Sequence, residues 1–292
     1  MIMKRRSFIK QVSGTSLCLP AFARSSNIPY IGEIGLQLYT LRKAIAKDLP
    51  KTLEEVAEAG YRQVEPYGFP SPQAIEMIKR AKDLGMKVNS SHFTWDSLLN
   101  PQKKGMRPFA EVLENAHNLN LTDLVVPYLH NEDRKDLPAY QRTAEKLNQG
   151  AEQADEARIR LAYHNHAFEF KPMQGNKTGF DIFVDSFSPK MRFEVDVFWV
   201  KLGGIEPTDL LQKLNNRITQ LHLKDLKKGS VCPNFGKIEP EAFDEIGDGM
   251  IPIIPIMRLA QKLGIMHCHV EQDHSPAPIQ SIQKSINFLK NQ

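Results

Sequence analysis

The sequence predicts a single (β/α)8 barrel, in which eight parallel strands are surrounded by helices. Short apolar segments alternate with longer amphipathic segments along the chain, and this alternation is typical of consecutive βα units. Roughly 270 residues remain after a short N-terminal segment, a length typical of one such barrel. No Gly/Ser-rich or Pro-rich linker divides them, so we expect one domain over residues 24–292.

Residues 1–23 are predicted to be an export signal of the twin-arginine type. Arg5 and Arg6 lie in the motif Arg-Arg-Ser-Phe-Ile-Lys, a short apolar stretch follows, and residues 21–23 form a small-x-small cleavage pattern. The apolar stretch is far shorter than the roughly 20 residues of a membrane span. We therefore expect an exported, periplasmic protein without a membrane span; an ordinary basic first helix is the alternative.

The charge of the chain argues against a nucleic-acid partner. The full chain has 38 Lys and Arg against 34 Asp and Glu. The predicted signal contains four of the basic residues and no acids, so its removal leaves 34 of each sign. The basic character thus belongs to the signal, which disfavours a related class of barrel that cleaves DNA.

Eight short apolar segments are predicted to form the barrel strands. In chain order they are residues 34–39, 63–65, 87–92, 123–127, 160–164, 191–196, 218–223 and 266–270. An open doubly wound sheet is the alternative architecture. It is disfavoured because no Gly-x-Gly-x-x-Gly motif follows the first strand.

Eight amphipathic stretches are predicted to be the helices between the strands and after the last one. Gly60, Gly85 and Gly264 follow three of them, as expected for residues that end helices. In chain order the helices are residues 49–59, 71–84, 108–119, 137–157, 180–187, 207–214, 253–263 and 279–289.

Four side chains of metal-binding type close successive predicted strands: His164, Asp196, His222 and Glu271. In a (β/α)8 barrel the carboxyl ends of the strands meet at the mouth, where catalytic residues collect. Two imidazoles and two carboxylates suit a borderline transition metal better than calcium. The spacing therefore predicts one divalent ion in the mouth of the barrel.

Motifs along nearly the whole mature chain resemble those of a known superfamily. They are residues 35–41, 64–68, 164–170, 196–200, 222–225, 247–249 and 270–273. Together they resemble the xylose isomerase-like barrel superfamily, in its sugar phosphate isomerase/epimerase group. The resemblance implies a carbohydrate substrate and one divalent ion, which would be manganese, cobalt or magnesium, with zinc as a further option.

The resemblance implies a ligand order of Glu, Asp, His, Glu in the epimerases of this group. The last three positions correspond to Asp196, His222 and Glu271. The first is occupied by His164, or by His166 if the strand is two residues longer, since alternate residues of a strand share a face. A symmetric exchange of the proton between two glutamates is therefore in question, and Glu169 is the carboxylate nearest in sequence that could substitute.

The expected chemistry is removal of a proton from a carbon next to a carbonyl, with Glu271 as the base. His166 or Glu169 would return the proton on the opposite face, which gives an isomerase or epimerase. Protonation of a leaving group instead would give β-elimination, the reaction of a dehydratase or a 3-keto-glycoside lyase. Both reactions begin from the same enediolate.

The remaining polar and aromatic residues near strand ends are predicted to bind substrate: Glu65, His92, Trp95, Trp199 and Lys224. For each, an ion pair or ordinary loop packing is the alternative. We expect a neutral sugar, keto-sugar or glycoside, because no Gly-rich phosphate loop is present. A non-catalytic sugar-binding barrel is the alternative of another class, although such a protein has no need of four metal-type ligands. The oligomeric state is left open, with a homo-oligomer as one option.

Overall fold

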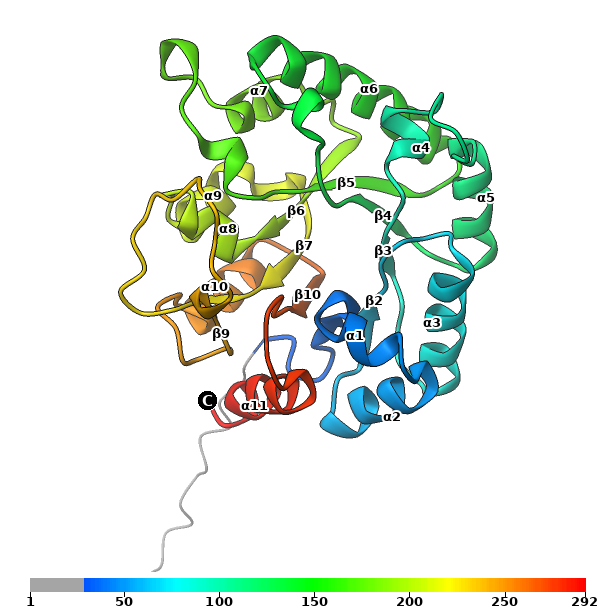
Figure 1. The fold of residues 1–292 in the computed structure, drawn as a ribbon, viewed down its shortest axis with the longest axis vertical. Coiled ribbons are helices and arrows are strands. Elements are labelled where there is room, and N and C mark those ends of the chain that lie inside the picture. The colour runs from blue at the N-terminus through cyan, green and yellow to red at the C-terminus, as the bar shows by residue number, and fades with distance from the viewer. Residues whose placement is uncertain (1–28) are drawn as a thin grey trace, which may run out of the picture.

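Eight parallel strands form a nearly closed barrel in the computed structural model, which describes residues 29–292 (Figure 1). The strands lie in the order β2, β1, β10, β7, β6, β5, β4, β3. Their bounds are β1 Gly35–Gln37, β2 Gln63–Glu65, β3 Ser90–His92, β4 Asp123–Val126, β5 Arg160–His164, β6 Met191–Asp196, β7 Ile218–Leu223 and β10 His267–Val270. The predicted signal, residues 1–23, lies outside the described residues.

Backbone hydrogen bonds also join β2 to β3, the two ends of this strand order. The Val64 N–H donates to the Lys87 carbonyl at 3.0 Å, and the His92 N–H donates to the Pro66 carbonyl at 2.9 Å. These hydrogen bonds between β2 and β3 close the sheet into a ring. The predicted (β/α)8 barrel is therefore confirmed.

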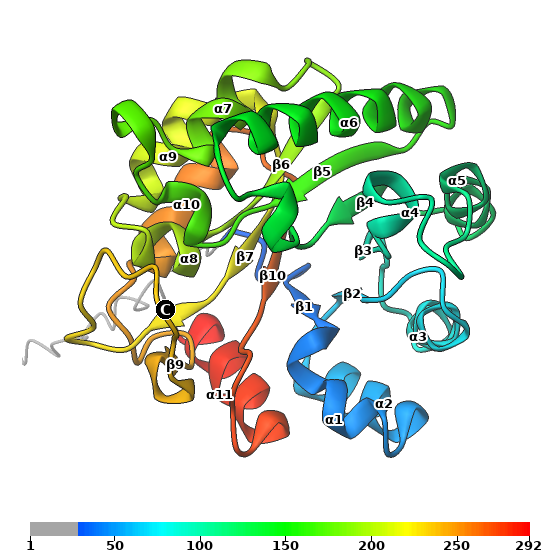
Figure 2. The same ribbon diagram turned by 45° about the horizontal axis from the view of Figure 1, so that its top comes forward.

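Helices surround the strands, as both views show (Figures 1 and 2). Their bounds are α1 Arg42–Ile45, α2 Leu49–Ala59, α3 Pro72–Asp83, α4 Asp96–Leu99, α5 Phe109–Asn118, α6 Leu137–Glu156, α7 Gly179–Ser186, α8 Val197–Leu202, α9 Pro207–Leu214, α10 Ile253–Lys262 and α11 Pro278–Lys290. Between residues 29 and 292, no helix is both long and apolar enough to cross a membrane.

Most predicted elements match the observed bounds within one residue at each end, but the first and third strands were predicted too long. The first strand ends at Gln37, whose side-chain oxygen accepts from the Tyr39 N–H and so starts a 3₁₀ helix over Leu38–Leu41. In the third segment only Ser90–His92 form a continuous ladder, while Lys87 makes an isolated bridge to Gln63.

The short elements after the strands were not predicted. They are the one- to two-turn helices α1, α4 and α8, and the antiparallel pair of β8 Asp225–Leu226 with β9 Phe243–Asp244. Such segments are too short to display a hydrophobic period, so the pattern of the sequence does not reveal them.

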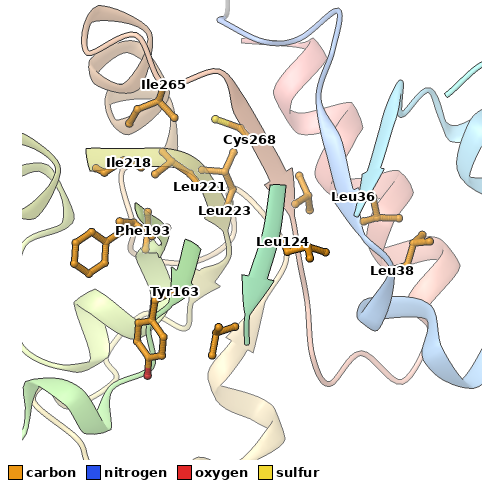
Figure 3. Packing of buried hydrophobic residues seen from close by; sticks show 14 of the residues in the cluster. Leu36, Leu38, Leu124, Tyr163, Phe193, Ile218, Leu221, Leu223, Ile265 and Cys268 are labelled. Atoms are coloured by element: carbon orange, nitrogen blue, oxygen red, sulfur yellow. The ribbon is translucent and has the colours of Figure 1, made fainter. Parts of the chain in front are cut away.

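Most barrel strands have an apolar outer face, and several have a polar inner face. Figure 3 shows outward side chains that pack in the buried cluster, among them Leu36, Leu124, Phe193, Leu221 and Cys268. Residues of the opposite parity are polar and buried: Gln37, Gln63, Glu65, Glu194, Asp196, Gln220, His222 and His269. Because side chains alternate along a strand, one apolar face anchors the helices while the other lines the interior with ionisable groups.

Gly35 leaves room for one of these interior side chains. A Cβ atom at Gly35 would lie 2.2 Å from Cδ2 of His269, and that ring is held by Gln63, whose Nε2 is 2.6 Å from His269 Nε2. We expect Gly35→Ala to lower the free energy of unfolding by about 1–3 kcal/mol, the usual cost of overpacking. Thermal unfolding measures this effect. Gly32→Ala is the control, because a Cβ there has no atom within 4 Å; equal stability of the two variants would contradict the prediction.

Candidate metal centre and active site

The four side chains predicted as metal ligands lie together at the carboxyl ends of four neighbouring strands. His164 ends β5, Asp196 ends β6, His222 lies in β7 and Glu271 follows β10. One nitrogen or oxygen atom from each lies within 4.8 Å of the others, and all four residues are buried. We call these four residues the metal-type cluster. It contains His164 and not His166, the other option left by the sequence.

Asp196 and Asn165 hold two of these strand ends in register. The side chain of Asn165 donates to the Asp196 carbonyl at 3.3 Å and accepts from the Asp196 N–H at 3.1 Å. Asp196 Oδ1 caps α8 by accepting from the N–H groups of Phe198 and Trp199 at 2.9 and 3.1 Å. The other oxygen, Oδ2, is left to face the cluster, 3.3 Å from His164 Nε2.

Lys224 is a buried cation beside the cluster. Its Nζ lies 3.1 Å from Asp196 Oδ2, 2.8 Å from Glu271 Oε2 and 3.0 Å from Asp273 Oδ2. Burial alone would lower the pKa of the Lys224 amine, but the three carboxylates outweigh it and hold that pKa well above its ordinary value. Burial likewise opposes ionisation of Asp196 and Glu271, yet Lys224 and the nearby imidazoles hold both carboxyl pKa values below the ordinary range.

The metal-type cluster fits a divalent cation. His164 Nδ1, His222 Nδ1 and Glu271 Oε2 are buried and lack a hydrogen-bond partner among the described residues. Glu271 Oε2 lies 2.8 Å from His222 Nδ1 and from Lys224 Nζ, but neither contact has hydrogen-bond geometry. Converging unpaired nitrogen and oxygen atoms are what a divalent ion requires.

Aromatic side chains line a cavity of about 360 Å³ at this site. His166 lies in its wall with its ring stacked on Phe168 at 5.2 Å and 5.0 Å from Trp199, and Tyr128 meets it edge-on at 5.2 Å. Burial among these rings holds the pKa of His166 well below its ordinary value. The His166 imidazole is therefore neutral, and its orientation is fixed by packing.

The structure separates the predicted substrate-binding residues into three positions. Trp199 lines the cavity, and Lys224 lies against the Trp199 ring with Nζ 5.5 Å from its centroid. Trp95 is half-buried on the far side of Tyr128, 6.2 Å away between ring centroids, and does not line this cavity. Glu65 and His92 are buried one layer deeper in the barrel, where Glu65 has no exposed surface.

Glu169 lies beneath the chain that follows β5. Its Oε1 accepts from the Tyr163 hydroxyl, and its Oε2 accepts from the His166 N–H at 2.9 Å. It has no exposed surface, and burial raises its pKa to about 8. Both oxygens are thus engaged within the protein, so the structure places Glu169 as a support for His166 rather than in the cavity.

Two groups that line the cavity were not among the predicted site residues. Asp273 bonds Lys224, and burial raises its pKa to about 7. Arg134 lies 3.6 Å above the Phe168 ring and donates to the Tyr128 hydroxyl at 3.0 Å. Asp273 follows Glu271 at the same parity, a signal that could have identified it. Arg134 follows β4 in an irregular loop, where nothing in the pattern distinguishes it from a surface arginine.

Comparison with known proteins gives consistent results. Residues 53–292 match the family model of the xylose isomerase-like TIM barrel. An inosose dehydratase from Clostridium perfringens is 24% identical over 270 residues, which cover 82% of this chain and 88% of that protein. The crystal structure of a sugar phosphate isomerase/epimerase from Parabacteroides distasonis has a TM-score of 0.68 and 25% identity, and the match covers 93% of this chain and 98% of that one. A probable 3-DHS dehydratase from Bacillus anthracis shares the fold, with a TM-score of 0.66 at 12% identity over 89% of this chain and 99% of that one.

Removal of one charge from the cluster tests its capacity to bind an ion. We expect Asp196→Asn to bind Mn²⁺ or Co²⁺ far more weakly, by more than the roughly 10–100-fold typical when a residue that only supports a ligand is lost. The amide oxygen can still cap α8, so the fold should persist. Isothermal titration of metal-free protein measures the affinity. Asp209→Asn, an exposed acid in the first turn of α9, is the control; equal affinity in both variants would argue against the cluster.

Proposed function

Because this chain belongs to the xylose isomerase-like TIM barrel family, we propose that it is a divalent-metal-dependent enzyme that isomerises or epimerises a sugar or keto-sugar. The observation that carries the proposal is the convergence of His164, Asp196, His222 and Glu271 beside an aromatic cavity. The matched proteins include inosose dehydratases and a D-psicose 3-epimerase, which supports a catalytic rather than a purely binding role.

The four residues of the metal-type cluster would hold the ion in this proposal. A bound divalent ion polarises a carbonyl and stabilises the negative charge that develops when the neighbouring carbon loses its proton. Manganese, cobalt and magnesium are the candidates, with zinc as a further option, because imidazole and carboxylate ligands are mixed. Lys224 keeps Glu271 and Asp196 ionised and fixes their positions.

Glu271 is the group that we assign to remove the proton. It is the carboxylate at the end of the last strand, and the nearby cations keep it ionised. His166 is assigned to return the proton in its protonated form, because its ring lies in the wall of the aromatic cavity. Burial lowers the pKa of this imidazole, so its protonated form gives up a proton readily. Glu169 is not assigned a proton transfer, since its two oxygens are bonded to Tyr163 and to the His166 backbone.

β-Elimination is the second candidate reaction, and two observations favour it. His164, an imidazole, occupies the first ligand position, where the epimerase pattern has a glutamate. The curated relatives that match the chain are inosose dehydratases. In this reaction Glu271 removes the proton next to the carbonyl, and the hydroxyl or alkoxide on the next carbon leaves with a proton, for which the protonated form of His166 is the candidate donor. The product is an unsaturated ketone with loss of water or of an alcohol.

Aromatic faces in the cavity suit the C–H surfaces of a sugar ring, with Trp199, Phe168 and Phe243 as the residues concerned. We propose a neutral sugar, keto-sugar or glycoside as the substrate, and an exported, periplasmic protein as its setting. No nucleic acid partner is proposed.

Hydrogen exchange with solvent tests the function. Metal-loaded protein is incubated in heavy water with a panel of ketoses and 3-keto-glycosides and followed by NMR. Isomerase or epimerase activity is expected to leave deuterium in a product of unchanged composition, whereas loss of water or aglycone identifies elimination. Glu271→Gln should slow either reaction by roughly 10²–10⁴-fold, as expected for loss of a general base.

The control for this experiment is Glu58→Gln, an exposed residue of α2 that should react like the unchanged protein. Metal content is measured in each variant, because Glu271 is also assigned as a ligand. A metal-loaded protein that binds sugars but exchanges no carbon-bound hydrogen would instead indicate a non-catalytic sugar-binding barrel.

Export is tested separately, through the first residues of the chain. Replacing Arg5 and Arg6 together by Lys should keep the protein in the cytoplasm, because the twin-arginine pathway reads the arginine pair rather than its charge. Fractionation of cells that express the full chain measures the location. Replacement of Lys4 by Arg is the control and should not alter export.

A further inference from the structure

A pair of glutamates lies directly beneath the metal-type cluster. Glu65 ends β2, Glu194 lies in β6, and neither has any exposed surface. Both approach the same nitrogen of the same ligand: His222 Nε2 is 2.7 Å from Glu65 Oε2 and 2.9 Å from Glu194 Oε1. The two strands are not neighbours in the barrel, so the pair meets across its interior.

All four oxygens of this pair are engaged within the protein. Gln220 Nε2 donates to Oε1 of Glu65 at 2.8 Å and also to Oε1 of Glu194. Gln37 Nε2 donates to Glu65 Oε2 at 3.1 Å, and His92 Nε2 lies 2.8 Å from Glu194 Oε2. Among the described residues, this hydrogen-bond network reaches the metal-type cluster through His222, whose Nε2 bonds Glu65.

His222 presents its two ring nitrogens to two different environments. Nε2 faces the glutamate pair, whereas Nδ1 faces the cluster, 2.8 Å from Glu271 Oε2 and 4.0 Å from Asp196 Oδ2. Glu65 accepts a hydrogen bond from Nε2 and Glu194 lies 2.9 Å from the same nitrogen, so a neutral ring whose Nδ1 binds an ion carries its proton on Nε2. Nδ1 then has a free lone pair directed at the centre, which is the form of imidazole that binds a metal.

We propose that Glu65 and Glu194 are positioning residues that fix the tautomer and orientation of His222 and thereby set the affinity of the centre for its divalent ion. The inference rests on the proposed function in one respect, the use of His222 as a ligand through Nδ1. It reassigns Glu65, which the sequence suggested as a substrate-binding residue, to a role that acts through His222.

Glu194→Gln is the milder test of this role. Its amide oxygen can still accept from Gln220 and His222, and its amide nitrogen can donate to His92, so the network persists while one charge is lost. Glu65→Gln is a more severe test. Both oxygens of Glu65 accept from donors, Gln220 at Oε1 and Gln37 at Oε2, so the amide nitrogen of the variant would face a donor in either orientation. Isothermal titration of metal-free protein with Mn²⁺ and with Co²⁺ is expected to give dissociation constants roughly 10–100-fold higher for each variant.

The control is Asp123→Asn, which removes a buried carboxylate at the opposite end of the barrel. Asp123 has no exposed surface and bonds Arg160 at 2.8 Å, far along the strands from His222. We expect this variant to lose stability but to retain the metal affinity of the unchanged protein. A purely structural role for the glutamate pair would instead make all three variants alike, with lower melting temperature and unchanged affinity.

A second measurement needs no variant. The ¹⁵N shifts of the His222 ring in protein loaded with diamagnetic Mg²⁺ or Zn²⁺ are expected to show a proton on Nε2 and none on Nδ1; the reverse assignment overturns the inference. Unchanged affinity in Glu65→Gln and Glu194→Gln also overturns it, while the proposed function stands. If the unchanged protein bound no divalent ion, the proposed function would fall, and the inference with it.

Discussion

Negative charge buried inside the barrel is the constraint around which the site is arranged. Glu65, Glu194, Asp196 and Glu271 are at most 5% exposed. Lys224 lies beside the last two, whereas imidazoles lie beside the first two. An unpaired buried carboxylate costs several kcal/mol, so each of these groups must have a neutralising neighbour. The imidazoles, the lysine and the glutamine amides provide those neighbours. The interior of this barrel is consequently a polar network, and the apolar core lies outside it, between the strands and the helices.

This charge balance extends from the interior to the cavity wall. Lys224 contacts Asp196 and Glu271 in the cluster and also Asp273, which lines the cavity. Replacement of any one of these carboxylates therefore alters the ionisation of the others, because they share one ammonium. The polar groups of the site act as a unit, and single replacements within it are not expected to be additive.

The sequence was sufficient for the strands and for the cluster because both follow from alternation. A metal-type residue at the end of an apolar segment must lie at the mouth of a parallel barrel, and His164, Asp196 and His222 do. The same parity rule, carried two residues back from Asp196, would have placed Glu194 in the interior. The contact of Glu194 with Glu65 of β2 could not be predicted, because contacts across a barrel depend on strand order and register and not on a local pattern.

The cavity was less accessible to sequence reasoning. Arg134, Phe168 and Trp199 come from three loops or short helices, and their stacking around His166 depends on how those segments pack. Glu169 was expected near the reacting groups because it follows His164 closely, but the turn after β5 directs its carboxylate beneath the chain. Position in the sequence predicts the direction of a side chain within a strand, but it no longer does so in the turn that follows the strand.

Asp196 divides its two oxygens between architecture and chemistry. One receives the first N–H groups of α8, the helix that carries Trp199 into the cavity wall, and the other faces the cluster. The direction of this carboxylate is thus common to the ion-binding geometry and to the shape of the space that receives a substrate. A rotation of the Asp196 carboxylate that improved the geometry for an ion would disturb the position of α8 and Trp199. The binding of the ion and the binding of the substrate are therefore coupled through this side chain.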